Sequence, residues 1–189
     1  MKLNKILQKL TLHSLKECSD KELEIIRKMR NEKKIRKNMV NDKIILIREH
    51  KKWVHQICQS NKNFFFVIKY NNIIIGGLGL KNYNNLTNTG EWSFYISEKK
   101  NFIGLGATIE FMAINYFFDK FKLNRLFCFV LTHNLEVVNL HKKFGFKEIS
   151  DNEYCKNNKL QIKKLDAIYL ILDRNNWNKN YYTIKKKFF

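Results

Sequence analysis

The feature that most limits the fold of this chain is a pair of apolar segments separated by only two residues. Residues 63–70 read NFFFVIKY, residues 73–80 read IIIGGLGL, and Asn71-Asn72 stands between them. Asparagine tolerates the positive φ angles of tight hairpin turns, and β-branched and aromatic residues favour strands. The two segments therefore predict a β-hairpin, so the centre of the chain is expected to be an antiparallel sheet.

Further strands and helices are expected on both sides of this hairpin. Apolar segments predict strands over residues 10–15, 91–97, 125–132 and 165–172, and a weak strand over residues 146–154. Helical spacing predicts helices over residues 19–30, 47–60, 104–121 and 134–144. The first helix begins with a capping box, Ser19 with Glu22, and the last ends at Gly145. This order predicts an α+β fold, with a mixed sheet and helices on both faces.

The composition bounds the class of protein. With 189 residues, 44% of them hydrophobic, the chain can form one domain with a sizeable core. No apolar run approaches the roughly 20 residues that cross a bilayer, and the N-terminus lacks the apolar segment of a signal peptide. We therefore expect a cytoplasmic protein with a single domain over residues 1–174, followed by a basic, aromatic tail over residues 175–189.

Cysteine spacing and charge narrow the class of ligand. The four cysteines are widely spaced and form no CxxC pair, so we expect reduced thiols, no disulfide and no metal. The net charge of +19 invites a nucleic-acid interpretation, but the charges are scattered along a sequence rich in lysine, asparagine and isoleucine. We interpret most of them as solvated surface that also attracts an anionic small ligand, and expect neither nucleic acid nor membrane as partner.

Two glycines in the segment NFIGLGATIEF, residues 101–111, precede a predicted helix. A dinucleotide fingerprint is disfavoured, because Ile109 stands at the third glycine position and no βαβ series surrounds it. Two interpretations remain open: a loop that needs positive φ, or a cradle for an anion. In the second, backbone N–H groups around Gly104 and Gly106 and the helix N-terminus hold a pyrophosphate.

Two motifs resemble those of the GNAT acyltransferase superfamily. Residues 101–106 resemble its pyrophosphate loop, Q/R-x-x-G-x-G/A, although Asn101 replaces the usual glutamine or arginine; Lys99 and Lys100 stand beside it. Residues 134–146, NLEVVNLHKKFGF, resemble N-x-x-A-x-x-L-Y-E-K-x-G-F with the same spacing. The resemblance implies the GNAT fold, acetyl-CoA as acetyl donor, and a central strand pair, residues 91–97 and 125–132, that splays apart to admit the pantetheine arm.

The resemblance also implies the residues that bind the cofactor. Asn134 would contact the pantetheine arm, although it equally suits the N-cap of the helix that follows. The full predicted set is Phe94, Ile96, Asn101, Phe102, Ile103, Gly104, Leu105, Gly106, Asn134 and Lys142.

The predicted catalytic residues follow from direct transfer of the acetyl group to an amine. His141 stands where the family usually has the tyrosine that protonates the departing thiolate, and an imidazole could donate that proton or simply pack on the helix. Tyr95 is a reserve donor. Glu91, or His50 through water, would accept the amine proton, and backbone N–H groups of residues 93–96 would stabilise the oxyanion.

The N-terminal half resembles bacterial acetyltransferases of the pseudaminic-acid pathway. The resemblance rests on Arg30-Asn31, Met39 and IREHKKW at residues 47–53. It implies acetylation of the 4-amino group of UDP-4-amino-4,6-dideoxy-N-acetyl-β-L-altrosamine, a nucleotide-sugar substrate. The predicted substrate-binding residues are Arg30, Met39, His50, Trp53 and Lys81. N-terminal acetylation of a ribosomal protein is the alternative, and a homodimer remains a possibility.

Overall fold

The computed structural model describes residues 2–158 and 165–189, in which seven strands form one sheet. The strands are β1 (Leu10–Ser14), β2 (Phe64–Tyr70), β3 (Ile73–Asn84), β4 (Thr89–Ile96), β5 (Arg125–Leu131), β6 (Lys147–Ile149) and β7 (Ala167–Asp173). Their order is β1-β2-β3-β4-β5-β7-β6, and β4 with β5 is the parallel pair in an otherwise antiparallel sheet.

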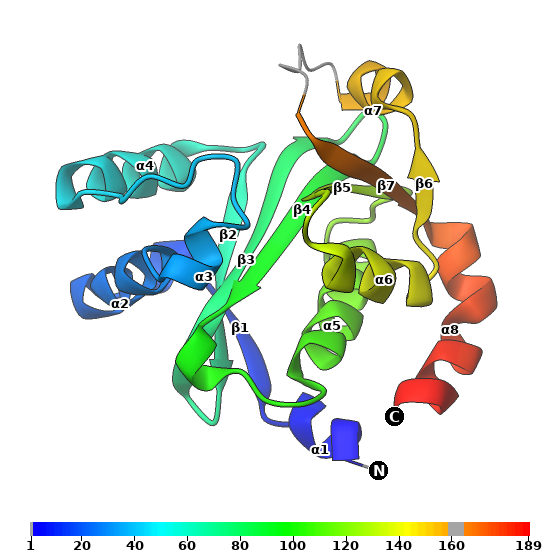
Figure 1. Cartoon of the computed structure of the whole chain (residues 1–189), viewed down its shortest axis with the longest axis horizontal. Helices are drawn as coiled ribbons and strands as arrows, with labels where there is room; N and C mark the ends of the chain where they lie inside the picture. The colour runs from blue at the N-terminus through cyan, green and yellow to red at the C-terminus, as the bar shows by residue number, and fades with distance from the viewer. Residues whose placement is uncertain (1, 159–164) are drawn as a thin grey trace.

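Helices cover both faces of this sheet, as Figure 1 shows. They are α1 (Lys2–Leu7), α2 (Asp20–Arg30), α3 (Lys33–Arg36), α4 (Ile47–Gln59), α5 (Leu105–Lys120), α6 (Leu135–Lys143), α7 (Asp151–Asn158) and α8 (Arg174–Phe188), with 3-10 turns η1 (Leu15–Glu17) and η2 (Glu98–Lys100). One face carries α2, α3 and α4, and the other carries α5, α6 and α8. The predicted α+β fold with a mixed sheet is confirmed.

The predicted hairpin turn is present between β2 and β3. Asn71 and Asn72 have φ values of 49° and 63°, which is the left-handed conformation that both central residues of a type I′ turn adopt. The capping box of α2 is also present: the Ser19 N–H donates to Glu22 Oε2 at 2.9 Å, and the Glu22 N–H donates to Ser19 Oγ at 3.4 Å. Both signals are local, so the sequence alone could predict them.

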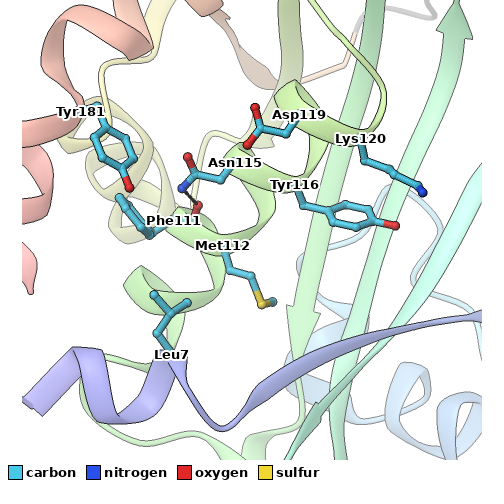
Figure 2. Close-up of a pocket in the computed structure, with 8 residues that line it drawn as sticks. All are labelled: Leu7, Phe111, Met112, Asn115, Tyr116, Asp119, Lys120 and Tyr181. Atoms are coloured by element: carbon cyan, nitrogen blue, oxygen red, sulfur yellow. Dashed lines mark hydrogen bonds between the residues drawn. The ribbon is translucent and has the colours of Figure 1, made fainter.

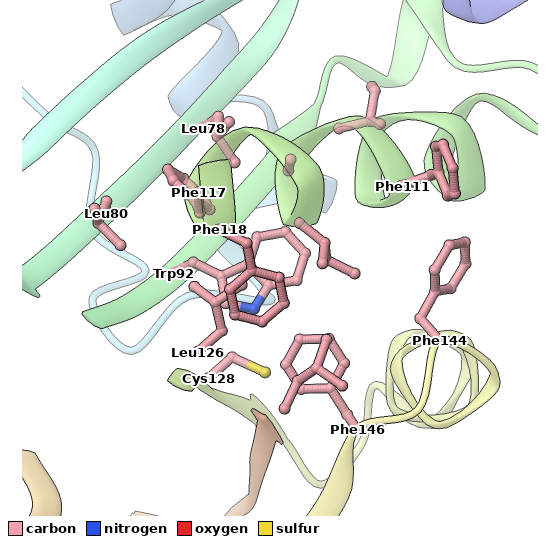
Figure 3. Close-up of a cluster of buried hydrophobic side chains, with 14 of the residues drawn as sticks. Leu78, Leu80, Trp92, Phe111, Phe117, Phe118, Leu126, Cys128, Phe144 and Phe146 are labelled. Carbon is pink, nitrogen blue, oxygen red and sulfur yellow. The ribbon is translucent and has the colours of Figure 1, made fainter. Parts of the chain in front are cut away.

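The main core lies between the sheet and α5 (Figure 3). Helix α5 is apolar on nearly every side, and the buried side chains around it include Leu80, Trp92, Phe117, Phe118 and Phe146. A second cluster on the opposite face packs α2 and α4 against the sheet through Leu15, Ile26, Met29, Val67 and Ile74. The sheet is therefore anchored on both faces, and its central strands are held where the site is built.

One segment differs from its sequence prediction, and the C-terminal segment is helical. The weak strand expected over residues 146–154 is wrong beyond Ile149, because α7 begins at Asp151. Tyr154 of α7 is fully buried against Phe127 and Tyr169, and that long-range packing leaves no periodic signal in the sequence. The C-terminal segment predicted as a tail is the helix α8, and its Trp177 and Ile184 are buried in the main core.

Candidate active site

Strands β4 and β5 separate soon after they begin. They pair only at Thr89 with Arg125, Gly90 with Leu126, and Glu91 with Phe127. Residues 92–96 of β4 and 128–131 of β5 then diverge, and we call these two segments the fork. Alternate residues of an unpaired strand edge direct N–H and C=O groups sideways, where an extended ligand can bond to them. The predicted splayed strand pair is confirmed.

The two glycines of residues 101–106 stand at the N-terminus of α5 and differ in why they are glycine. Gly104 is the N-cap residue with φ of +87°, a conformation that side chains disfavour. A Cβ built there would also stand 2.3 Å from Leu3 Cδ2. The fold itself therefore explains Gly104, in agreement with the interpretation that this loop needs positive φ.

Gly106 has no such internal reason. It lies in the first turn of α5, and a Cβ there would meet only Leu140 Cδ2 at an ordinary 3.8 Å. Nothing described in the chain requires glycine there, and the missing side chain leaves the backbone open to the close approach of a ligand. The position suits a pyrophosphate, because the first N–H groups of a 16-residue helix and its dipole favour an anion.

The other predicted cofactor residues lie around this helix end and along the fork. Asn134 is the N-cap residue of α6, but its side chain makes no capping hydrogen bond. Phe94 and Ile96 are half-buried on the α5 side of β4, and Phe94 stacks on Trp92. The remaining exposed members are Asn101, Phe102, Ile103 and Lys142, and Lys142 Nζ pairs with Glu148 at 2.7 Å. Their roles stay predictions.

His141 is buried at the point where the fork opens. Its ring lies 5.3 Å from that of Trp92, the first residue of β4 beyond the pairing with β5. It also interacts with Cys128, the first residue of β5 beyond that pairing. Its Nδ1 lies 2.8 Å from Glu110 Oε1 of α5. Burial opposes the charge on His141, but the attraction of Glu110 and Cys128 outweighs burial and raises the pKa to about 10.

Glu110 is a site residue that the sequence analysis missed. Its side chain is completely buried, and burial raises its pKa against the attraction of His141. The signal was present: Glu110 is the sole charged residue between residues 101 and 118.

The opposite face of β4 carries the other two predicted catalytic residues. Glu91 is 7% exposed, and its Oε2 accepts a hydrogen bond from the Tyr154 hydroxyl at 2.6 Å. Tyr95 lies four residues further along the same face, with its ring 6.3 Å from that of Phe65. Burial raises the pKa of Tyr95, although Arg30 opposes the shift. His141 and Tyr95 thus lie on opposite faces of the sheet.

Most predicted acceptor residues line up beside Tyr95. The Trp53 ring lies 5.3 Å from the ring of His50 and 5.0 Å from that of Phe65. Arg30 donates from Nη2 to the Asn41 carbonyl at 3.0 Å, but its buried Nη1 has no partner among the described residues. Burial lowers the pKa of Arg30, and the nearby Tyr95 opposes this shift.

His50 also has a buried nitrogen atom without a hydrogen-bond partner among the described residues. His50 is 6% exposed, the unpartnered atom is Nε2, and burial followed by the charge of Arg27 lowers its pKa. Met39 is half-buried in the loop after α3. Lys81 is exposed, and it pairs in register with Glu91 of β4. Glu91 stands four residues before Tyr95 on that strand. The register therefore places Lys81 away from the predicted acceptor residues beside Tyr95.

A groove of about 680 Å³ runs along the outer side of α5 (Figure 2). Leu7 of α1, Tyr181 of α8 and several α5 residues, including Met112 and Tyr116, line it. None of the predicted site residues lies there. In the described part of the chain, no cluster of side chains suits a metal ion and no helix is long and apolar enough to span a membrane.

Known proteins share this architecture. Residues 15–161 match the family described as acetyltransferase (GNAT) domain. Acetyltransferase PseH of Campylobacter jejuni subsp. jejuni serotype O:23/36 (strain 81-176) is 29% identical over 136 residues, 71% of this chain and 83% of that protein. Its structure in complex with acetyl coenzyme A is also similar, with a TM-score of 0.66 at 20% identity over 87% of this chain and 99% of that one.

A second solved structure matches more of the geometry. Spermidine N-acetyltransferase from Vibrio cholerae, in complex with CoA and spermine, has a TM-score of 0.77 at 17% identity, covering 90% of this chain and 99% of that one. The family match spans well over half of the chain. The chain belongs to the GNAT acetyltransferase family, an acetyl-CoA-dependent class of enzyme, and the fork and the helix end at Gly106 fit that donor.

Proposed function

We propose that this enzyme transfers the acetyl group of acetyl-CoA to the 4-amino group of a UDP-4-amino-4,6-dideoxy sugar, a step of pseudaminic acid biosynthesis. One arrangement carries the proposal: the cofactor loop, residues 101–106, and a face with two unpartnered buried nitrogen atoms, Arg30 Nη1 and His50 Nε2, lie on either side of the fork. Unpaired buried polar atoms are costly, so their presence supports a ligand that pairs with them. The similarity to PseH agrees with this acceptor.

The residues on the acceptor face suit the two ends of such a substrate. The Arg30 guanidinium can pair with a phosphate oxygen of the UDP group through its free Nη1. Met39, Trp53 and Tyr95 offer apolar surface for the 6-deoxy methyl group. Lys81 stands apart from them, so its contact with the substrate requires the nucleotide to extend along β4 toward Glu91.

The mechanism is direct transfer without a covalent enzyme intermediate. When bound, acetyl-CoA supplies a thioester carbonyl that a neutral amine can attack. Backbone N–H groups of residues 93–96 stabilise the oxyanion from the unpaired edge of β4. Glu91, or His50 through water, takes the amine proton, and His141 or Tyr95 returns a proton to the departing thiolate.

The test measures thiol release from acetyl-CoA with the UDP-4-amino sugar and, in parallel, with the N-terminal peptide of a ribosomal protein. Release with the sugar alone supports the proposal; release with the peptide alone supports the alternative acceptor and refutes this one. Arg30→Lys should raise KM for the sugar at least tenfold and leave KM for acetyl-CoA unchanged, because lysine cannot reproduce the guanidinium geometry. Arg125→Lys is the matched control, because Arg125 forms an exposed ion pair with Asp173.

We also propose that the enzyme works in the cytoplasm and that it forms a homodimer. Cell fractionation tests the location, and sedimentation equilibrium of the full chain tests the dimer: a single species at the mass of one 22.8 kDa chain would refute it.

A further inference from the structure

The buried pair of Glu110 and His141 has no counterpart in the motif that this chain otherwise resembles. The family's tyrosine needs no counter-ion, because a phenol is neutral and has an ordinary pKa of about 10. A histidine in its place has an ordinary pKa of about 6.5, and burial makes the imidazolium still less favourable. Without help, His141 would hold no proton to donate at neutral pH.

Glu110 supplies that help from the neighbouring helix. Its Oε1 lies 2.8 Å from His141 Nδ1, the histidine is 4% exposed and the glutamate completely buried. Glu110 Oε2 has no hydrogen-bond partner among the described residues, so His141 is the group that compensates this buried carboxylate. With Nδ1 committed to Glu110, the proton that can pass to sulfur is the one on Nε2, the nitrogen that remains for the ring's hydrogen bond with Cys128.

The pair of Glu110 and His141 also lies where β4 and β5 stop pairing, at the opening of the fork. The His141 ring lies beside Trp92 and interacts with Cys128, the first residues of β4 and β5 after their last paired position. The groups that face the ring are therefore Glu110 from α5, the Cys128 thiol from β5, and the aromatic rings of Trp92 and Phe146. Lys142 and Lys143, which follow on α6, are exposed.

We infer that Glu110 is a positioning residue that holds His141 as an imidazolium at the opening of the fork, where it donates its Nε2 proton to the thiolate leaving acetyl-CoA. The amine forms the new C–N bond, the C–S bond breaks, the amine proton goes to the base, and the Nε2 proton goes to sulfur. The inference rests on the proposed function for its last step. The neighbouring Glu110 raises the pKa of His141, so the ring keeps a proton that an isolated buried imidazole would lose.

The decisive variant is Glu110→Gln, which keeps the shape and a hydrogen-bond acceptor for Nδ1 but removes the charge. In the wild-type enzyme kcat should stay constant until the pH approaches 10. In the variant the loss should begin at or below the ordinary histidine pKa of 6.5, so that kcat at pH 8 falls at least about thirtyfold while KM for acetyl-CoA is unchanged. Asp119→Asn removes an exposed carboxylate from the same helix and should behave as the wild type.

A rescue separates this role from a structural one. His141→Tyr restores the family's neutral donor, so Glu110→Gln should have little further effect on kcat in that background. If the double variant loses as much activity as Glu110→Gln alone, or if Glu110→Gln leaves the pH profile in place, the inference is wrong.

Titration of His141 by NMR of the ¹³C-labelled imidazole needs no acceptor. It should show a pKa above 9 in the wild type and a fall of more than two pH units in Glu110→Gln. A wild-type pKa near or below 6.5 overturns the inference. Failure of the sugar amine to release thiol would instead refute the proposed acceptor and leave this titration to decide the pairing.

Discussion

Glu32 and Ser97, sixty-five residues apart, are joined by a hydrogen bond of 2.6 Å from Ser97 Oγ to Glu32 Oε1. The second carboxylate oxygen of Glu32 accepts the backbone N–H of Glu98 at 2.7 Å, and Lys34 forms an ion pair with Glu98. The turn between α2 and α3, on the acceptor face, is thereby held to the end of β4, just before the cofactor loop. One carboxylate connects the two halves of the candidate site.

Replacing Glu32 should therefore affect cofactor binding, although it lies outside the predicted cofactor set. In Glu32→Gln both charge-assisted bonds weaken and the loop of residues 98–104 loses its anchor, so acetyl-CoA should bind about fivefold more weakly, a loss of about 1 kcal/mol. Isothermal titration calorimetry measures the change. Glu17→Gln, an exposed glutamate, is the control. An unchanged Kd in Glu32→Gln would show that the loop keeps its shape without this anchor.

The two glycines of the cofactor loop should separate stability from binding. Gly104→Ala places a side chain in a left-handed conformation against Leu3, so it should lower the free energy of unfolding by about 1–2 kcal/mol. Gly106→Ala should leave that free energy unchanged or raise it by up to about 1 kcal/mol, because alanine favours helices. It should nevertheless weaken acetyl-CoA binding at least tenfold, since its methyl group occupies the approach to the backbone.

Urea unfolding and calorimetric binding of both variants check this prediction. Equal acetyl-CoA affinity in Gly106→Ala and the wild type would mean that the pyrophosphate does not approach this residue.

The parts of the fold that the sequence predicted are those with local causes. The Asn71-Asn72 turn, the Ser19 capping box and the glycine at the start of α5 each depend on a few neighbouring residues. Helix α7 could not be predicted in this way, because Tyr154 is buried by contacts with the sheet rather than by any periodicity of its own segment.

The candidate site shows the same division. The motif spacing predicted Gly106 and Asn134, but a motif does not say which side chains meet. Glu110 lies 31 residues before His141, and only the packing of α5 on α6 brings them together. The separation of Lys81 from Arg30 likewise follows from strand register, which the sequence left undefined.

The stability of the fold between about pH 2 and pH 6 should depend on the charge of Glu22. Lys69, followed by Ser19, lowers the pKa of this carboxylate from its ordinary 4.5 to about 2, and Lys69 Nζ lies 2.7 Å away. A depressed pKa stabilises the fold above pH 4.5, and the contribution disappears as the pH falls from 4.5 to 2. Glu22→Gln keeps a capping-box residue, so it should lower the urea midpoint at pH 6, and this difference should shrink as the pH falls toward 2.

Urea midpoints measured at several pH values between 2 and 6 test this prediction, with Glu17→Gln again as the exposed control. A difference between Glu22→Gln and the wild type that stays constant down to pH 2 would show that the charge of Glu22 does not stabilise the fold.

Helix α8 should be required for folding, although its sequence suggested a tail. Trp177 is 2% exposed, its ring packs 5.7 Å from that of Phe111, and its Nε1 donates to Asn115 Oδ1 at 3.3 Å. Trp177→Ala should lower the free energy of unfolding by about 3–5 kcal/mol, the usual cost of removing a buried tryptophan. Tyr182, 80% exposed on the same helix, provides the matched control. Tyr182→Ala should change the free energy of unfolding by less than about 0.5 kcal/mol.

Urea unfolding of both variants and of a chain ending at residue 174 measures these effects. The shortened chain should not unfold cooperatively, because it exposes the surfaces of Phe111 and Phe144 that α8 covers. If Trp177→Ala and Tyr182→Ala are equally stable and the shortened chain folds, residues 175–189 are a tail, and the domain ends at residue 174 as the sequence predicts. If they differ as expected, α8 belongs to the same folding unit as the fork, because both are packed on α5.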